Sequence, residues 1–424
     1  MDVRTHPEEA LALNAALAVP RKRDWRAALA GLFELDSHNA RLTPMEGMRG
    51  IAILLVFVCH YNGIVGEPIK LAGSIAHVSR LIGLFGASGV DLFFVLSGFL
   101  IYQAALKPKL NYGRFMRRRA ERIYPTFLAI FAVYIVLMGL HIGPSKLPHG
   151  APNVARYLVA NLLLLPGIFN IPAIIAAAWS LSYEFSFYIA LPLVTITLAL
   201  NRWRRRDRII FFAFIAIAYI AACEALPHAA PRYEAAWSGS HVRMVMFVAG
   251  ILVYELLHVE SFVAAITRRV EWLLLALTFA GVAAVFAILI IAARYGTARE
   301  GDLPVQVALL QVVPVFVGYL AFGLLGLRPL GLAGSFLEQP WLRWTGNMSY
   351  SFYLVHSIPM HFITLVLLRL TFVKTHVVAT YLLALPITLA ITYVCSGVVF
   401  AYVEKPLSLR PRRLARKRQG VVTA

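Results

Sequence analysis

The sequence predicts an all-α fold: a polytopic integral membrane helix bundle with about ten crossing helices, one re-entrant or interfacial segment and both termini in the cytoplasm. The first reason is composition. Of 424 residues, 60% are hydrophobic and 14% are charged, and the mean hydropathy of +0.72 lies outside the range of soluble globular domains. The other two reasons are the recurrence of long apolar segments and the placement of basic residues between them.

Apolar segments near or above the ~17 to 25 residues that a crossing helix needs recur along almost the whole chain. They lie at residues 51–66, 81–106, 123–140, 154–170, 178–200, 209–225, 243–258, 271–293, 305–327, 349–368 and 377–402. Each is a candidate crossing helix, and the chain has no internal repeat or second soluble domain between them.

Most of the excess positive charge lies in five short segments between the apolar ones. These are RKRDWR (21–26), RFMRRRAER (114–122), RWRRRDR (202–208), RR (268–269) and RPRRLARKR (410–418). Lys and Arg between crossing helices are typical of cytoplasmic loops. We therefore attribute the net charge of +19 to membrane topology and expect no nucleic-acid partner, although a basic surface is also common in nucleic-acid-binding proteins.

The basic segments also limit the number of crossings. Two cytoplasmic segments must be separated by an even number of crossings, but three apolar segments lie between residues 122 and 202. The weakest is 154–170, which is short and follows a proline-containing loop. We predict that it is re-entrant or interfacial on the non-cytoplasmic side, a geometry tolerated where protein or water covers the backbone.

Three parts of the chain are expected. Residues 1–41 alternate apolar and charged positions at helical intervals and have no signal-peptide core, which predicts a cytoplasmic amphipathic leader. Residues 42–407 form one membrane domain, and 408–424 form a basic cytoplasmic tail. The cysteines at positions 59, 223 and 395 lie far apart with no metal-ligand spacing, so we expect packing roles and neither a bound metal nor a bound cofactor.

Several ionisable residues interrupt the apolar segments. His60 follows Arg49 by eleven residues, which predicts a shared helix face and a depth of about 16 Å at ~1.5 Å per residue. Asp91 and His356 are also expected near the midplane, whereas Glu184 is expected near the outer mouth. Such residues are costly in a bilayer and by default indicate function.

Each of these features also has a structural explanation. His356 suits an interhelical hydrogen bond, and Asp91 suits a structural ion pair with a His or Arg. The arginine cluster at 114–122 suits an ordinary cytoplasmic loop, and the small residues at 83–89 suit close helix packing.

The combination of these features favours chemistry across the membrane. A midplane histidine, a carboxylate to orient it and an arginine-rich cytoplasmic mouth suit a reaction between an anionic donor inside and an acceptor outside. A phosphate-rich donor such as coenzyme A suits arginine forks. Arg119 and Arg122 are three residues apart and share one helical face.

Six ordered motifs stand out along the chain: MEGMRGIAILLVFVCHYNG (45–63), GVDLFFVLSGFLI (89–101), RRRAERIYP (117–125), WSLSYEFSFYIALPL (179–193), GNMSYSFYLVHSIP (346–359) and YVEKPL (402–407). Together they resemble the successive signatures of the acyltransferase 3 family of membrane O-acyltransferases. The resemblance covers about Leu42 to Leu407. The family's Arg and His signature maps onto Arg49 and His60, and its RxxR signature maps onto Arg119 and Arg122.

The resemblance implies a multi-pass protein of the cytoplasmic (inner) membrane. It implies transfer of an acyl group, commonly acetyl, from cytoplasmic acyl-CoA as co-substrate to a hydroxyl of an extracytoplasmic carbohydrate, glycolipid or similar acceptor. Some relatives carry a fused C-terminal SGNH-type domain, which we do not expect after the RPRRLARKRQGVVTA end. A transporter or channel for a small or anionic substrate is the alternative, because broken helices and buried charges also line transport paths.

Roles for individual residues follow from the chemistry of acyl transfer. A hydroxyl needs a base to attack a thioester, and His60 is predicted to be that base, oriented by Asp91 or Glu184. A covalent acyl-histidine is a less favoured variant. Arg49, Arg119 and Arg122 are predicted to bind acyl-CoA. Candidate substrate or oxyanion contacts are Trp179, Ser180 and His356, with Arg49 a further oxyanion candidate.

Overall fold

The computed structural model describes residues 30–34, 43–140, 147–169, 171–229, 241–294, 305–328 and 331–409. All regular secondary structure in these ranges is helical, which confirms the predicted all-α class. Contacts divide the chain into Met1–Asp36 and Ser37–Ala424, and the fold below is that of the second unit. The predicted leader and basic tail lie almost entirely outside the described residues.

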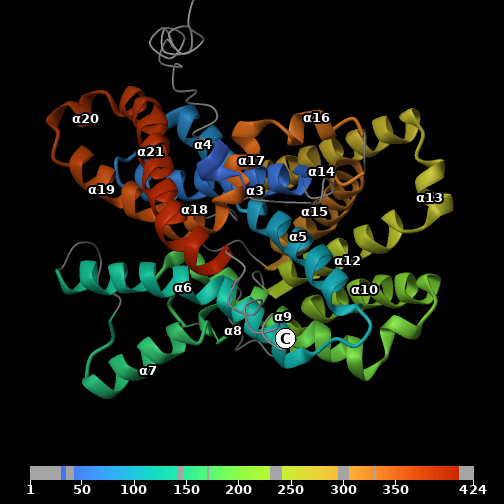
Figure 1. The fold of residues 1–424 in the computed structure, drawn as a ribbon. Helices are drawn as coiled ribbons and strands as arrows, with labels where there is room; N and C mark the ends of the chain where they lie inside the picture. Colours follow the sequence, from blue (N-terminus) through green and yellow to red (C-terminus); the bar gives the residue numbers. More distant parts are fainter. Residues whose placement is uncertain are drawn as a thin grey trace, which may run out of the picture. The chain divides into compact units, whose positions relative to one another are not determined.

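The helices of the described ranges follow one another along the chain (Figure 1). The first half contains α3 (Thr43–Tyr61), η2 (Asn62–Gly66), α4 (Gly73–Gly86), α5 (Ser88–Ala105), α6 (Tyr112–Gly139), α7 (Ala151–Leu162), α8 (Pro166–Phe169), η3 (Ala176–Ala178), α9 (Trp179–Thr197), η4 (Leu200–Arg202) and α10 (Arg205–Ala229). The second half contains η5 (Val242–Met244), α12 (Val245–Leu257), α13 (Glu260–Ala265), α14 (Arg268–Arg294), α15 (Val305–Gly326), α16 (Gly334–Leu337), α17 (Pro340–Asn347), α18 (Ser349–Val355), α19 (Ser357–Leu367), α20 (Thr371–Thr375), α21 (Val377–Val399) and η6 (Phe400–Leu409).

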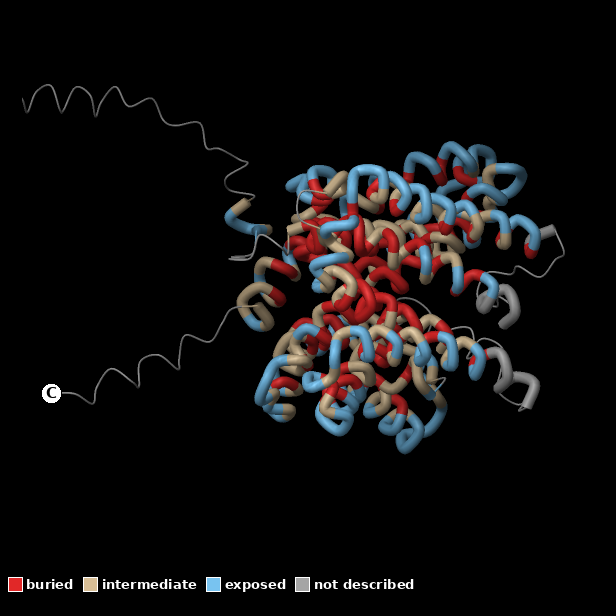
Figure 2. Tube along the Cα trace, turned by 90° about the vertical axis from the view of Figure 1, so that its right-hand side faces the viewer, coloured by how far each residue is buried: buried red, intermediate tan, exposed pale blue. Residues whose placement is uncertain are grey.

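Six helical stretches in the described part of the chain are long and apolar enough to cross a membrane. They are Thr43–Gly66, Gly73–Ala105, Tyr112–Gly139, Arg268–Ala292, Ser349–Leu367 and Val377–Leu409. Apolar side chains are exposed on the outer sides of the helices, where Figure 2 shows most of the exposed surface. The protein is therefore a multi-pass membrane protein, while the number of ten crossings and the side of the termini stay predictions.

The first crossing helix begins earlier than predicted. α3 starts at Thr43, so Arg49 lies within the helix and not at its mouth. The extension is stabilised by Glu46, whose carboxylate accepts a hydrogen bond from Arg343 Nε at 2.9 Å. Hydropathy alone missed the start of α3 because Glu46 counts as a charged residue. The ion pair with Arg343 makes Glu46 compatible with burial.

The segment predicted not to cross forms two short helices. α7 has 12 residues, about 18 Å of helix, which is shorter than the ~30 Å apolar core of a bilayer. The chain then turns at Leu164, whose φ is 56°, into the four-residue α8. The Asn161 side chain accepts a hydrogen bond from the Ile174 backbone at 2.8 Å, which ties the returning chain to α7.

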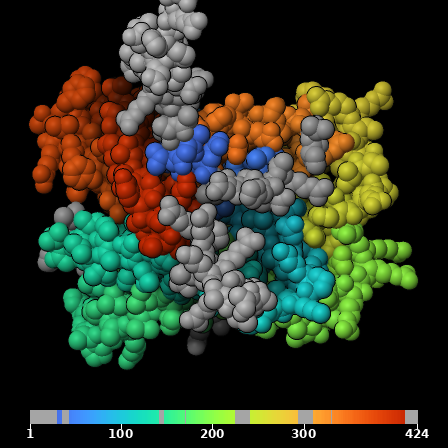
Figure 3. Space-filling view, in the orientation of Figure 1, coloured from blue at the N-terminus to red at the C-terminus, as the bar shows by residue number. Residues whose placement is uncertain are grey.

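Helix α3 lies at the centre of the packing. The C-terminal α16 and α17 pack against α3, so the blue and orange parts of the chain lie side by side (Figures 1 and 3). A side chain at Gly346 would meet the backbone carbonyl of Glu46. α5 crosses α12 in the same way, with Gly98 against the Phe247 carbonyl and Gly250 against the Val95 carbonyl. Small residues thus allow close backbone contact.

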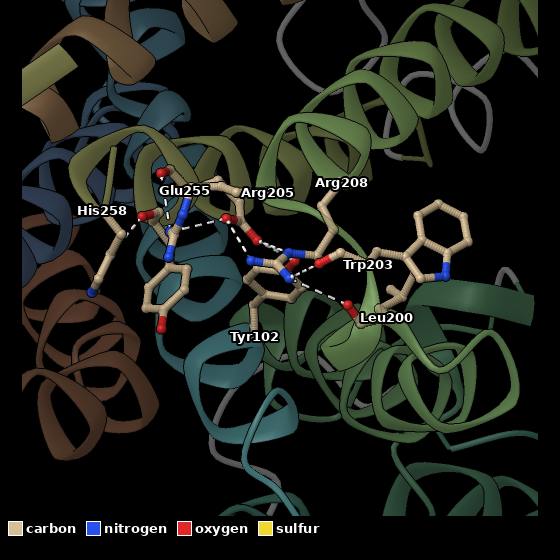
Figure 4. A network of polar contacts seen from close by, with 8 residues as sticks. Tyr102, Leu200, Trp203, Arg205, Arg208, Glu255 and His258 are labelled. Carbon is tan, nitrogen blue, oxygen red and sulfur yellow. Dashed lines mark hydrogen bonds and ion pairs between the residues drawn. The ribbon is translucent and has the colours of Figure 1, made fainter. Parts of the chain in front are cut away.

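A buried ion-pair network joins α5, α10 and α12 (Figure 4). Glu255 is 0% exposed and accepts hydrogen bonds from Arg208 Nε at 2.5 Å and Arg205 Nη1 at 3.1 Å. Tyr102 of α5 donates to the same carboxylate at 2.5 Å. Because one carboxylate satisfies two cations and a hydroxyl, its loss leaves several polar groups unpaired.

We predict that Glu255→Ala destabilises the protein by about 3–5 kcal/mol, the usual effect of removing one partner of a buried pair. Thermal unfolding of purified protein in detergent measures the change. Glu260→Gln, at an exposed position at the start of α13, is the control and should leave stability within about 0.5 kcal/mol of wild type. Equal stability of the two variants would contradict a structural role for the network.

A second prediction concerns α7. Single cysteines at His149 and Pro172, both exposed and on either side of α7 and α8, should react with an impermeant thiol reagent from the same side of the membrane. Arg206→Cys, in an exposed basic segment, should react only from the other side. Labelling of His149→Cys and Pro172→Cys from opposite sides would mean that the segment crosses after all.

Candidate active site

A cavity of about 120 Å³ lies among α3, α5, α6, α9 and α18. Its polar lining comprises Arg49, Ser97, Arg119, Arg122, Ser180, Glu184, Tyr188, Ser349, Tyr350 and Tyr353. We call it the arginine cavity. It brings together the three arginines predicted to bind acyl-CoA, and it places Ser180 and Glu184 beside them.

Two of the three arginines have no hydrogen-bonding partner in the part of the chain that the structure describes. Arg49 makes no hydrogen bond or ion pair there. Arg119 has a buried Nε without a partner, and its guanidinium lies over the rings of Phe115 and Tyr188, at 5.2 Å and 5.6 Å from the ring centroids. Half-buried guanidinium groups that make no hydrogen bond with the protein keep their donors available, so the cavity favours an anionic ligand.

The third arginine is held by a carboxylate. Arg122 Nη1 donates to Glu404 Oε1 at 2.8 Å, and its guanidinium lies 5.9 Å from the centroid of the Tyr350 ring. Glu404 belongs to η6, at the other end of the domain sequence. The helical face shared by Arg119 and Arg122 is therefore anchored in two ways, by stacking and by an ion pair.

Glu184, predicted near the outer mouth, lies in the arginine cavity beside Arg119 and Arg122, which are predicted at the cytoplasmic mouth, so the two predicted depths do not both hold. Its carboxylate accepts hydrogen bonds from Ser97 Oγ at 2.6 Å and from the Tyr188 hydroxyl. Hydroxyl donors on α5 and α9 thus satisfy this carboxylate inside the protein. Arg49 lines the same cavity.

His60 and His356 form a pair outside the cavity lining. Their ring centroids are 4.8 Å apart at an interplanar angle of 64°. His60 Nδ1 lies 2.9 Å from the Val56 carbonyl, and His356 Nδ1 lies 2.7 Å from the Tyr353 carbonyl. Because a carbonyl only accepts, each neutral ring donates from Nδ1 and keeps a lone pair on Nε2. His356 is fully buried and its Nε2 has no partner among the described residues.

Tyr353 joins the histidine pair to the arginine cavity. It lines the cavity, and its ring lies 6.0 Å from that of His356. Its hydroxyl donates to the Ala177 carbonyl and shares a hydrogen bond with Ser180 Oγ, both at 2.6 Å. The histidine pair thus lies directly behind one wall of the cavity.

Asp91, one of the two carboxylates predicted to orient His60, is paired with Arg243 instead. Arg243 Nη1 donates to Asp91 Oδ2 at 2.5 Å, and this pair lines a separate cavity of about 10 Å³ with Ser88 and Gln311. This agrees with the alternative of a structural ion pair. Neither Asp91 nor Glu184 is hydrogen-bonded to His60 within the described ranges. Asp91 is held by Arg243, and Glu184 by Ser97 of α5 and by Tyr188 of its own helix.

The remaining predicted contact, Trp179, lies away from the cavity lining. Its ring packs edge-on against Tyr183, with centroids 5.8 Å apart. Sequence reasoning missed Tyr188 and Glu404. Tyr188 lies four residues after Glu184 on the same helical face, a spacing that indicates contact. Glu404 is the carboxylate of the YVEKPL motif, which directly follows the last apolar segment. Within the described residues, no cluster of three or more His, Cys, Asp or Glu side chains could hold a metal ion.

Comparisons with known proteins agree with this architecture. The Acyltransferase domain family (Acyl_transf_3) matches residues 44–397. The chain is 29% identical over 404 residues to the acyltransferase MdmB of Streptomyces mycarofaciens, covering 91% of this chain and 95% of that protein. It is 28% identical over 183 residues to the O-acetyltransferase OatA of Staphylococcus aureus, covering 40% and 27%. No solved structure matches the chain at a significant level. The chain therefore belongs to the Acyltransferase domain family and is a multi-pass membrane enzyme that transfers acyl groups.

Proposed function

We propose that this enzyme transfers an acyl group, acetyl in the simplest case, from cytoplasmic acyl-CoA to a hydroxyl of an extracytoplasmic carbohydrate or glycolipid. The observation that carries the proposal is the arginine cavity, in which Arg49 and Arg119 make no hydrogen bond or ion pair with the described residues. The similarity to OatA, whose name describes an O-acetyltransferase, supports an oxygen acceptor. The cavity opens on the cytoplasmic side of the inner membrane in this proposal.

The donor is acyl-CoA because its phosphates suit the cavity. A guanidinium presents N–H donors in a planar fork that matches two oxygens of a phosphate. Arg119 keeps its whole fork available, since aromatic rings rather than acceptors hold it in place. Arg49 lies on the facing helix α3, so an anion between them contacts cations from two sides.

The acceptor is activated at His60. The Nε2 lone pair of His60 takes the proton of the acceptor hydroxyl as its oxygen attacks the thioester carbonyl carbon. The new C–O bond forms, the tetrahedral intermediate collapses, and the C–S bond breaks. The proton then passes from His60 to the departing thiolate, so the products are the ester and free coenzyme A. Ser180 and Arg49 line the cavity and are candidates for stabilising the oxyanion.

Arg119→Lys should weaken donor binding while the protein still folds. The charge remains but the bidentate fork is lost, so we expect affinity for coenzyme A to fall by about tenfold or more. Isothermal titration of purified protein with coenzyme A measures it. Arg118→Lys, at the exposed neighbouring position, is the matched control. If both variants bind coenzyme A like wild type, the arginine cluster reflects topology alone.

His60→Ala should abolish transfer with little loss of folded protein, because a small neutral residue is easier to bury than imidazole. General bases contribute ~10² to 10⁴ in rate, and we expect a loss of that order in kcat. The measurement is acyl transfer from acetyl-CoA to a panel of oligosaccharide acceptors. His361→Ala, at an exposed histidine of α19, is the control. Turnover of the His60→Ala variant close to that of wild type would refute this mechanism.

A further inference from the structure

The most fully buried carboxylate near the arginine cavity is Glu404, whose YVEKPL motif has no part in the reaction as described. Its side chain is 0% exposed, although it lies only a few residues before the end of the described chain. It belongs to η6, a π-helical segment from Phe400 to Leu409. π-Helical turns are rare and are frequent at functional sites.

Both oxygens of Glu404 have fixed partners. Oε2 accepts hydrogen bonds from the Ser351 backbone N–H at 3.0 Å and from Ser351 Oγ at 2.6 Å. Oε1 accepts from Arg122 Nη1 at 2.8 Å. The carboxylate is therefore held by α18 on one side and holds α6 on the other, where η6 packs directly against α6 (Figure 3).

The ion pair with Glu404 fixes the Arg122 side chain but leaves most of its hydrogen-bond donors free. A guanidinium has five N–H donors, and the structure assigns only one of them to Glu404. The Arg122 side chain is 24% exposed and lines the cavity. Its remaining donors are thus available to an anion, while the ion pair removes the rotamer freedom that would otherwise be lost when the anion binds.

We infer that Glu404 is a positioning residue of the donor site, which fixes the Arg122 guanidinium so that it binds an anionic group of the donor. The inference rests on the proposed acyl-CoA function and adds a residue to it. The competing explanation is that Glu404 merely neutralises Arg122. The two explanations predict opposite changes in the affinity for an anionic donor when Glu404 is replaced. Loss of a neutralising charge strengthens anion binding, whereas loss of a positioning contact weakens it.

The test is Glu404→Gln, which keeps the side-chain shape and removes the charge. We expect the dissociation constant for coenzyme A and the KM for acetyl-CoA to rise about tenfold, as for the loss of a charge-assisted hydrogen bond. The kcat should change by less than about twofold, because Glu404 does not touch the reacting atoms. Tyr402→Phe, on the same segment at 78% exposure, is the control and should bind like wild type.

A double-mutant cycle separates positioning from general support of the fold. In an Arg122→Ala background, Glu404→Gln should have no further effect on donor affinity, since no guanidinium is left to position. Ser351→Ala removes one donor to Glu404 and should raise the dissociation constant by a smaller factor, about two- to threefold. This variant carries the test if Glu404→Gln does not fold.

Three results would overturn the inference. They are unchanged or tighter coenzyme A binding by Glu404→Gln, an equal effect of Glu404→Gln with and without Arg122, and, where only Ser351→Ala folds, donor affinity equal to wild type. Failure of the wild type to bind coenzyme A is a different outcome, because it overturns the proposed donor and the role of Glu404 with it. Wild-type binding that Glu404→Gln leaves intact removes only the positioning role.

Discussion

The cost of an unpaired charge inside a membrane domain is the constraint on which the rest of this structure depends. Most buried carboxylates are paired with arginines that lie far apart from them in sequence, and Glu271 is also paired with Arg268 of its own helix. The pairs are Glu46 with Arg343, Asp91 with Arg243, Glu255 with Arg205 and Arg208, Glu271 with Arg268 and Arg328, and Glu404 with Arg122. Close backbone contacts at glycines bring these helices near enough for the pairs to form. Charge pairing and small-residue packing thus support each other.

The arginine cavity is where pairing is incomplete. Arg49 and Arg119 have no hydrogen-bonded or ion-paired partner in the described ranges, and Glu184 is held by the hydroxyls of Ser97 and Tyr188 instead of by a cation. The arginines give the cavity a positive electrostatic potential, which a bound anion would neutralise. The features that make the cavity suitable for an acyl-CoA donor are therefore the same ones that a purely structural core would avoid.

The proposed reaction draws on two neighbouring regions that share one wall. The residues proposed to bind the acyl donor line the arginine cavity. The proposed base, His60, belongs to the histidine pair behind Tyr353. Tyr353 is fixed from both sides of its hydroxyl, by Ser180 and by the Ala177 carbonyl. This separation keeps the anionic part of the donor beside cations and leaves the imidazole of His60 in a less charged environment. Both regions are built on helices, which hold catalytic groups more precisely than loops do.

The sequence by itself determined the all-α membrane class, the short segment between 154 and 170, and the family, because hydropathy, basic segments and ordered motifs are local properties of the chain. It also singled out Arg49, Arg119 and Arg122, which do line one cavity. Only the tertiary structure decided the partners. Asp91 turns to Arg243 and not to His60, and Glu184 joins the arginines. Depth counted along one helix gives no information about which neighbouring helix supplies a counter-charge or a hydroxyl, and in a low-dielectric interior that neighbour determines where an ionised group lies.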